Sequence, residues 1–554
     1  MFKNILKHPL TYILSFSLII RLIMINYGLP LWLYNDEPPY ILGALKMLQL
    51  KTILPVLHEQ EFISFLYYPP YICYLFLPFF VLVASISIIT FDGSMADYIS
   101  YVASDPSIFF LTGRFVIILI SLLSIYFIYR VTKNIFGEEK LALLSAFLVS
   151  TSLIHILLSV TSKQWMPIFF IYVLGLYFLS NKNLSVNKRF IYSSIVTGIG
   201  TGISTITILF VIVMFFWYIF VEDKRLKELL TGSLFYKVSI ILITLSILPA
   251  IIYPASFGFA PDMTIDRSKD MYGVITSPLF FNLRLLRTEP VIFILFLIGL
   301  FFGFKKNKPF YIVSISFIYL YSIIFYIFFR FEYRFLMPII VFLCIGASYG
   351  YNILQYKMSK RSSLFILITV VIFSLATSIR ISYLGYVNDS RVLVKEWMDA
   401  NTKPDTKVIV YANLMRLPNS IEGINEQYFI DPNSLRTNDK NEKVLDKKLR
   451  FGNVYHALNL YTVKNENFYN SIVDYAKNNN YEYLIISKQD FLNDQSQFKK
   501  MRKLTENAIL LDKFGNNERD YSLGKTEIGP TLLPLFKINE FGPEIEIYKI
   551  TIKN

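Results

Sequence analysis

The sequence predicts a polytopic α-helical membrane protein with a C-terminal extracytoplasmic α/β domain. Hydrophobic residues make up 54% of the 554 residues, and charged residues only 17%. Up to residue 384 the chain contains repeated apolar runs, many of them reaching the roughly 20 residues with which a helix crosses a bilayer. From about residue 385 the composition becomes polar and rich in Asn and Lys. We therefore divide the chain into a transmembrane domain, residues 1–384, and a soluble domain, residues 385–554.

Twelve apolar runs make up the predicted transmembrane domain. They lie near residues 10–30, 71–90, 108–129, 141–161, 164–180, 190–206, 207–221, 238–253, 290–304, 310–329, 335–353 and 363–383. The first run is too long for a cleaved signal peptide and lacks a small-residue cleavage site. We therefore expect it to remain as a membrane anchor.

The soluble domain shows the pattern of an α/β fold. Residues 391–401 place Val392, Val394, Trp397 and Met398 where an amphipathic helix would bury them. Short apolar segments at 407–411, 483–487 and 545–550 predict strands, separated by polar loops. This domain holds 24 basic and 23 acidic residues, so it is almost neutral.

The net charge of +14 comes from the loops between the apolar runs. The connections near residues 130–140, 181–189, 222–237, 305–308 and 357–361, together with Lys3 and Lys7, hold 18 basic and 5 acidic residues. That difference accounts for the whole charge of the first 384 residues. Short basic loops stay in the cytoplasm. The charge therefore reports topology, and we expect no nucleic-acid partner.

The basic loops also limit the number of membrane crossings. If Lys7 and Arg130 are both cytoplasmic, an even number of crossings separates them, yet three apolar runs lie between them. Residues 71–90 follow Pro69-Pro70 and contain Pro78, so we predict a juxtamembrane or re-entrant helix there. The result is a multi-pass plasma-membrane protein with about 11 transmembrane helices. Its N-terminus would be cytoplasmic, and its first outer loop would comprise residues 31–70.

Charged residues of both signs are predicted on the outer face. Asp36-Glu37 opens the first outer loop, and later outer segments contribute arginines and a further carboxylate. A carboxylate can accept a proton from an attacking hydroxyl group, and arginine presents a planar fork of donors that matches a phosphate. Charged residues at helix ends also serve as interfacial anchors. Composition alone leaves both interpretations open.

An ordered set of motifs gives a more specific prediction. The motifs are Asp36-Glu37 with Tyr40 and Ala44, then Tyr68-Pro69-Pro70-Tyr71, Arg114, the basic stretch 129–137 ending in Phe136-Gly137, and Tyr333-Arg334-Phe335-Leu336-Met337-Pro338. In this order, over roughly residues 10–350, the chain resembles the GT-C-fold glycosyltransferases, in particular the protein-mannosyltransferase and aminoarabinose-transferase families.

The resemblance implies an inverting hexosyl- or pentosyltransferase on the extracytoplasmic face. The donor would be a polyprenyl-phosphate sugar in the membrane lipid, and the acceptor a glycan, glycolipid or protein. Asp36 would be the general base, with Glu37 beside it. The candidates for binding the donor phosphate are Arg334, Arg114, Arg284, Arg287 and Lys163. The candidates for lining the cavity are Tyr68, Tyr333, Arg330 and Glu332.

The sequence departs from the family pattern at two positions. Some relatives carry a Lys before the Pro-Pro pair, where this chain has Tyr68. Many also carry a second Asp in the stretch that corresponds to residues 162–167, where this chain has Lys163 and no carboxylate. These departures bear on the sugar and the acceptor more than on the reaction class.

Other cofactors and functions remain as alternatives. A divalent cation is one, held by Asp36 with His58, Glu59 and Glu61, although such loop side chains are more often solvated. A transporter or flippase of lipid-linked sugars is a second, and a non-catalytic envelope assembly protein a third. Transporters tend to show repeated halves. We see no internal repeat, and the charges gather at the outer rim.

Overall fold

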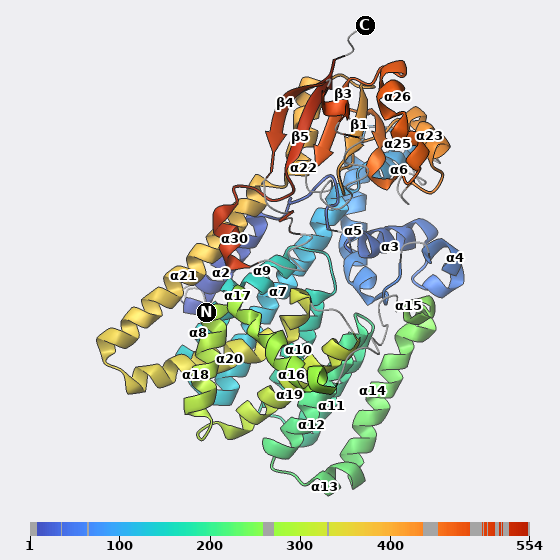
Figure 1. The fold of residues 1–554 in the computed structure, drawn as a ribbon. Helices are drawn as coiled ribbons and strands as arrows, with labels where there is room; N and C mark the ends of the chain where they lie inside the picture. The colour runs from blue at the N-terminus through green and yellow to red at the C-terminus, as the bar shows by residue number, and fades with distance from the viewer. Residues whose placement is uncertain are drawn as a thin grey trace.

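The computed structural model describes most of the chain. The described residues are 8–34, 36–63, 66–258, 271–328, 332–435, 453–487, 501, 503–506, 508–515, 520–521, 523 and 531–551. They form a helical bundle with a small domain containing a β-sheet at one end (Figure 1). This architecture confirms the predicted fold class.

The first half of the bundle alternates long helices with short ones. Its elements are α2 (Pro9–Ile23), α3 (Pro38–Leu50), η1 (Pro55–His58), α4 (Glu59–Phe62), α5 (Tyr71–Thr90), α6 (Met95–Ser104), α7 (Ser107–Phe136), α8 (Glu139–Thr151), α9 (Leu153–Ser159), α10 (Trp165–Ser180) and α11 (Val186–Thr201). Two of the short helices follow sharp bends. The chain turns by 78° between α3 and η1, and by 60° between α8 and α9.

The second half of the bundle ends in a helix that leads to the sheet domain. Its elements are η2 (Thr205–Leu209), α12 (Phe210–Phe220), α13 (Leu226–Thr231), α14 (Ser233–Ile252), α15 (Ala255–Gly258), α16 (Met271–Leu283), α17 (Leu285–Thr288), α18 (Pro290–Gly303), α19 (Lys308–Phe328), η3 (Tyr333–Leu336), α20 (Met337–Lys357) and α21 (Lys360–Val387). Six helices of the described chain are long and apolar enough to cross a membrane, or up to eight segments if each bent pair is one span. Helix α5 is one of the six, so the predicted total of 11 crossings remains a prediction.

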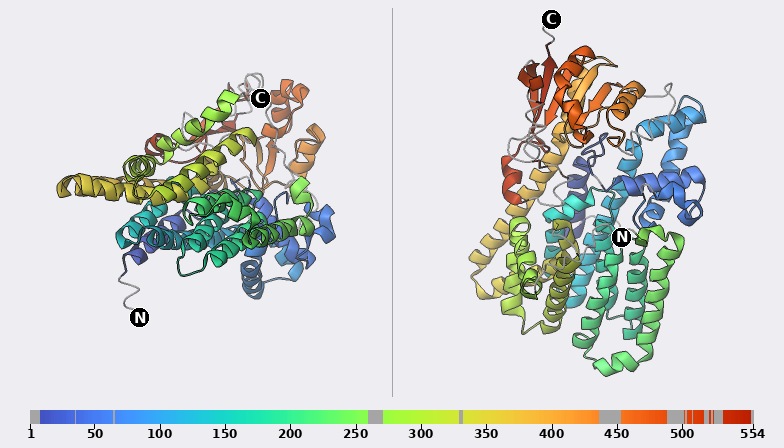
Figure 2. Two further views of the ribbon diagram at one scale, coloured as in Figure 1. Left: turned by 90° about the horizontal axis from the view of Figure 1, so that it is seen from below. Right: turned by 45° about the vertical axis from the view of Figure 1, so that its right-hand side comes forward.

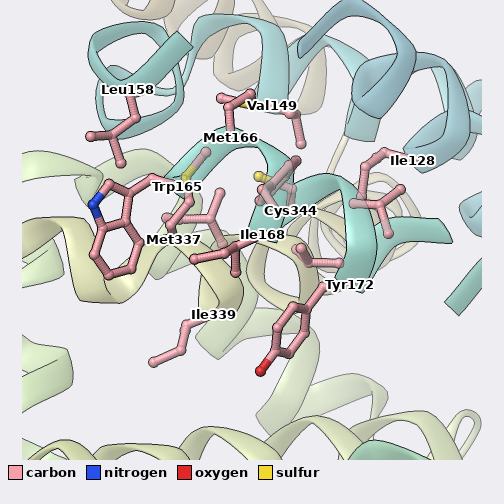
Figure 3. Packing of buried hydrophobic residues seen from close by; sticks show 14 of the residues in the cluster. Ile128, Val149, Leu158, Trp165, Met166, Ile168, Tyr172, Met337, Ile339 and Cys344 are labelled. Carbon is pink, nitrogen blue, oxygen red and sulfur yellow. The ribbon is translucent and has the colours of Figure 1, made fainter. Parts of the chain in front are cut away.

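Helix α20 lies at the centre of the bundle and packs against α18, α8 and α10. Figure 3 shows part of this core, where Trp165, Met166 and Ile168 of α10 lie near Met337 and Cys344 of α20. Glycines allow α18 and α20 to approach closely, because a Cβ atom at Gly350 would lie 1.9 Å from the carbonyl oxygen of Leu295. In contrast, α14 exposes most of its surface, as expected of a helix that faces lipid.

The two ends of the bundle differ in charge. At one end His8 contacts Glu139 at 3.1 Å, and Lys133 of α7 pairs with the same carboxylate. Arg114 lies near the opposite end of α7. The 19 residues between Arg114 and Lys133 span about 28 Å along the helix. Arg114 donates to the carbonyl oxygen of Tyr27, whose hydroxyl donates to Asp389 of the C-terminal domain, so the sheet domain lies at the Arg114 end. Figures 1 and 2 show this domain at one end of the bundle.

The C-terminal domain is an α/β unit, as its sequence pattern predicts. Its strands are β1 (Lys407–Tyr411), β2 (His456–Asn459), β3 (Tyr483–Ser487), β4 (Ala508–Phe514) and β5 (Ile545–Ile550), in the order β2-β1-β3-β5-β4. Strands β2, β1 and β3 are parallel, and β5 is antiparallel to both of its neighbours. The helices are α22 (Ser390–Asn401), α23 (Ile421–Ile430), η5 (Leu460–Thr462), α25 (Glu466–Asn470), α26 (Ile472–Asn478) and α30 (Leu532–Lys537).

The loop that follows α2 is fixed to this domain. Leu31 and Leu33 are buried in one cluster with side chains of β1 and α22. The hydroxyl of Tyr27 donates to Asp389 at 2.6 Å, and Asp389 is also paired with the buried Arg391 at 3.0 Å. The C-terminal domain therefore holds the segment that immediately precedes Asp36.

Candidate functional site

Three segments that are distant in sequence meet at Asp36. Asp36 lies between α2 and α3, and its Oδ2 accepts a hydrogen bond from Nη1 of Arg334 at 2.8 Å. The Nζ atom of Lys163 lies 3.8 Å from the same oxygen. The Lys163 side chain is 1% exposed, whereas those of Arg334 and Asp36 are 18% and 24% exposed. The site therefore consists of a partly accessible carboxylate between two cations.

The two cations determine the charge of Asp36. Burial raises the pKa of the carboxyl group, but the Lys163 ammonium and the Arg334 guanidinium outweigh burial and hold the pKa below its ordinary value. The Asp36 carboxylate is therefore ionised at neutral pH and can accept a proton.

Glu37 and Arg114, suggested by the sequence as a catalytic and a phosphate-binding residue, form a buried ion pair with each other. Both side chains are fully buried, and Arg114 binds both carboxylate oxygens of Glu37, at 2.8 and 2.7 Å. The same guanidinium also donates to the carbonyl oxygens of Ile25 and Tyr27. Neither charge is left for a substrate, so a catalytic role for Glu37 and a phosphate-binding role for Arg114 do not fit this geometry. The pair instead braces the loop that carries Asp36.

Each of residues 162–164 contacts a different residue of the 36–40 segment. The backbone N–H of Ser162 donates to Glu37 Oε1 at 2.7 Å. Lys163 faces Asp36, and Gln164 accepts a hydrogen bond from the hydroxyl of Tyr40. The carboxylate that the family resemblance led us to expect in this stretch is thus replaced by a lysine that points at Asp36.

The segment before these residues is itself fixed by a buried acid. Glu289 lies at the bend between α8 and α9, where its Oε1 accepts hydrogen bonds from the Ser152 hydroxyl at 2.6 Å and from the Ile154 amide at 2.9 Å. Helix α9 leads directly to the 162–164 turn. Glu289 thus fixes the bend that precedes the 162–164 turn, and it was not among the residues selected from the sequence.

Arg334 is held by a second carboxylate and by aromatic rings. Its Nε pairs with Glu332, which is almost completely buried. Its guanidinium carbon lies 5.6 Å from the centroid of the Trp165 ring and 5.5 Å from that of Phe335. These contacts orient the guanidinium toward Asp36. Arg334 and Glu332, both candidates from the sequence, thus form a chain of contacts that ends at Asp36.

A group of tyrosines lines the side of the site near α3. Tyr68 stacks on Tyr40, with ring centroids 5.1 Å apart, and contacts Tyr67 at 4.6 Å. Burial, followed by the charge of Asp36, raises the pKa of the Tyr67 hydroxyl to about 12. Tyr67 therefore remains a neutral hydrogen-bonding group beside Asp36. Tyr68 was among the residues predicted to line the cavity, whereas Tyr67 was not.

The other predicted arginines lie at the edge of the site. Arg287 hydrogen-bonds to Tyr333, the neighbour of Arg334, and Arg284 lies close enough to act on the same hydroxyl electrostatically. Both arginines are exposed. They extend the positive charge outward from Arg334. Arg330 lies outside the described residues.

The residues proposed for a divalent cation do not fit one. In the described part of the chain, no group of three His, Cys, Asp or Glu side chains is arranged to hold a metal ion. Glu61 pairs with Lys46 at 2.7 Å, and His58 is exposed on η1. The positions that surround Asp36 are occupied by cations, which disfavour a further positive charge.

Comparison with known proteins gives one family match. Residues 109–253, which run from α7 to the end of α14, match the model described as dolichyl-phosphate-mannose-protein mannosyltransferase. The matched segment contains Arg114 and the 162–164 turn. Over this segment the chain is similar to a family of glycosyltransferases, and glycosyl transfer is the activity that this similarity supports. The alternatives of a transporter and of a non-catalytic assembly protein are not favoured.

Solved structures of similar glycosyltransferases align with the enzyme at low identity. The structure of ArnT from Cupriavidus metallidurans bound to undecaprenyl phosphate is 11% identical, with 97% of each chain covered and a TM-score of 0.47. The oligosaccharyltransferase AglB from Archaeoglobus fulgidus, in complex with an inhibitory peptide and a dolichol-phosphate, is 13% identical. That alignment covers 87% of this chain and 69% of the other, with a TM-score of 0.43. A search of curated protein sequences found no match.

Proposed function

We propose that the enzyme transfers a sugar from a polyprenyl-phosphate carrier to an acceptor hydroxyl or amide group on the extracytoplasmic face, with Asp36 as the general base. The observation that carries this proposal is the position of Asp36 between Lys163 and Arg334. Asp36 supplies a proton acceptor, and Lys163 and Arg334 supply two cations that can bind a phosphate, in one partly exposed place. This is the arrangement that displacement of an anionic leaving group requires.

The reaction would proceed in one displacement. The acceptor passes its proton to an Asp36 oxygen while its nucleophilic atom forms a bond to the anomeric carbon of the sugar. The bond between that carbon and the phosphate oxygen breaks, and the electron pair leaves with the polyprenyl phosphate. Because the nucleophile enters opposite the leaving group, the configuration inverts.

The charged residues would divide the work between the two reaction partners. Arg334 offers a fork of N–H donors to the phosphate, and Lys163 contributes a buried point charge beside it. Arg284 and Arg287 guide the anionic head group toward them. Tyr67 and Tyr68 give the site an aromatic wall with hydroxyl groups, which suits a sugar ring.

The orientation of the bundle supports an outer-face reaction. Asp36 follows the 27–34 segment, which packs against the C-terminal domain, whereas Lys133 pairs with Glu139 about 28 Å along α7 from Arg114. Figure 1 shows the C-terminal domain at one end of the bundle. The positive-inside rule assigns the end with the basic loops to the cytoplasm. The active site and the C-terminal domain would then both face outward.

The test is sugar transfer by the Asp36→Asn variant. An amide keeps the shape of the carboxylate and cannot accept the proton, so we expect turnover to fall about 10²–10⁴-fold. The assay follows a radiolabelled sugar from a polyprenyl-phosphate donor in membranes. Asp97→Asn is the matched control, since Asp97 only caps the exposed helix α6. Near-normal turnover of a folded Asp36→Asn enzyme would overturn the assignment.

A further inference from the structure

Helix α30 of the C-terminal domain has one buried face and one exposed apolar face. Leu532 and Leu535, followed by Ile538, are buried against side chains from α2, α9 and α21. Leu533 and Phe536 point outward and are 76% and 49% exposed. Lys537 lies next to them and is also exposed. Exposure of neighbouring Leu and Phe side chains to water is unfavourable, so this face indicates contact with another apolar surface.

Arg380 fixes α30 to the long helix α21. Its Nε donates to the carbonyl oxygen of Leu535 at 2.9 Å, and its Nη2 donates to that of Ile538. A groove of about 450 Å³ lies between the two helices and is lined by Ala376, Ile379, Arg380, Tyr383 and Phe536. Figures 1 and 2 both show α30 lying beside α21.

The position of Arg380 along α21 gives the depth of this contact. Helix α21 begins at Lys360, next to Arg361, and Arg380 lies 20 residues after Lys360. At 1.5 Å per residue this separation is about 30 Å, which is the thickness of the hydrocarbon core. A helix that begins at one membrane surface and crosses the bilayer would therefore carry Arg380, and with it α30, to the opposite surface.

The exposed surface of α21 is continuous with that of α30. Ile372 and Ile379 are 61% and 57% exposed, and Tyr383 and Tyr386 follow at 50% and 72%. This sequence of side chains, apolar and then tyrosine, is typical of a helix that passes from hydrocarbon into the interfacial layer. Leu533 and Phe536 extend the same apolar surface sideways at the level of the tyrosines.

We propose that α30 is a membrane-interface helix that seats the C-terminal domain in the outer leaflet. Leu533 and Phe536 enter the boundary between head groups and acyl chains, while Lys537 reaches the lipid phosphates. Lipid is the occupant that the surface favours, because α30 continues the lipid-facing side of a spanning helix. The contact holds the domain against the membrane while the domain holds the 27–34 loop that precedes Asp36.

Spin-label accessibility tests this placement. Leu533→Cys and Phe536→Cys are labelled with a nitroxide in the full-length enzyme, reconstituted in nanodiscs of phosphatidylcholine and phosphatidylglycerol. Phe429→Cys is the matched control, because Phe429 is 84% exposed and lies at the far side of the domain, on α23. The native Cys73 and Cys344 are buried, so the unsubstituted enzyme provides the blank.

The collision rates with two reagents decide the outcome. At positions 533 and 536 we expect oxygen, which concentrates in lipid, to relax the label more than the water-soluble nickel complex does. At position 429 we expect the reverse order. Preferential relaxation by nickel at both 533 and 536 would place α30 in water. Protection from both reagents would show that protein covers it, and either result would overturn the proposal.

Discussion

Replacement of Lys163 by methionine should move the pH dependence of catalysis. Lys163 lies 3.8 Å from Asp36 Oδ2 and is 1% exposed, so methionine fills the same space and removes only the charge. The ammonium lowers the pKa of Asp36, and its removal must therefore raise that pKa. Since the base works only when ionised, the acidic limb of the kcat/KM profile should move to higher pH.

The distance gives the size of the effect. Two unit charges 3.8 Å apart interact by about 4 kcal/mol at an effective dielectric constant of about 20. At about 1.4 kcal/mol for each pKa unit, this corresponds to an upper limit of about 3 units. Asp36 is partly exposed and Arg334 remains beside it. We therefore expect a shift of about one to two pH units, because solvent screens part of the interaction.

The assay is the pH profile of sugar transfer for the Lys163→Met enzyme against the unsubstituted enzyme. Lys133→Met is the matched control, because Lys133 pairs with Glu139 at the other end of the bundle. The control should keep the original acidic limb. A lower plateau alone would report weaker stabilisation of the leaving phosphate. An acidic limb at an unchanged pH in a folded Lys163→Met enzyme would show that Lys163 does not determine the charge of Asp36.

Three other changes test separate parts of the structure. Glu37→Gln leaves the fully buried Arg114 without its ionised partner, so unfolding should require about 3–5 kcal/mol less. Glu61→Gln, at an exposed pair that solvent screens, should lower the thermal-unfolding temperature much less than Glu37→Gln does. Equal losses in the two variants would contradict the structural role of Glu37. Arg334→Lys keeps the charge and loses the planar fork, so KM for the donor should rise modestly. Arg334→Ala should raise the donor KM severely. An unchanged donor KM in the alanine variant would mean that Arg334 is only an interfacial anchor. Asn433 is exposed on the C-terminal domain, and Asn433→Cys should react with a membrane-impermeant maleimide in intact cells, whereas labelling only after lysis would place both the domain and Asp36 in the cytoplasm.

Elements with a strong local signal were predictable from the sequence. The apolar runs form helices in the structure, although only six helices of the described chain are individually long and apolar enough to cross a membrane. In the soluble domain, the strands at 407–411, 483–487 and 545–550 form where alternating or continuous apolar residues are bounded by polar turns. The order of strands was not predictable, because β1 pairs with segments about 50 and 75 residues away in the chain.

The site was predictable only where charge was conspicuous. Asp36, Lys163, Glu332 and Arg334 meet in the structure as the sequence suggested. Glu37 and Arg114 looked like equally good candidates, because a sequence does not reveal that two charges will neutralise each other in a buried pair. Ser162 acts through its backbone N–H, a group that every residue except proline carries. No side-chain pattern can indicate such a contact.

The Asp36–Arg334 contact links donor binding to base strength. In the described state one guanidinium contacts both Asp36 and Glu332. A donor phosphate that binds the fork formed by Nη1 and Nη2 of Arg334 would compete with Asp36 for the Nη1 donor. Asp36 then loses a charge-assisted hydrogen bond, so its pKa rises and its affinity for a proton increases. By reciprocity, protonation of Asp36 weakens its hold on Arg334 and favours the phosphate. In the proposed mechanism the carboxylate would thus be a weak base while the site is empty and a stronger one when the leaving group is in place.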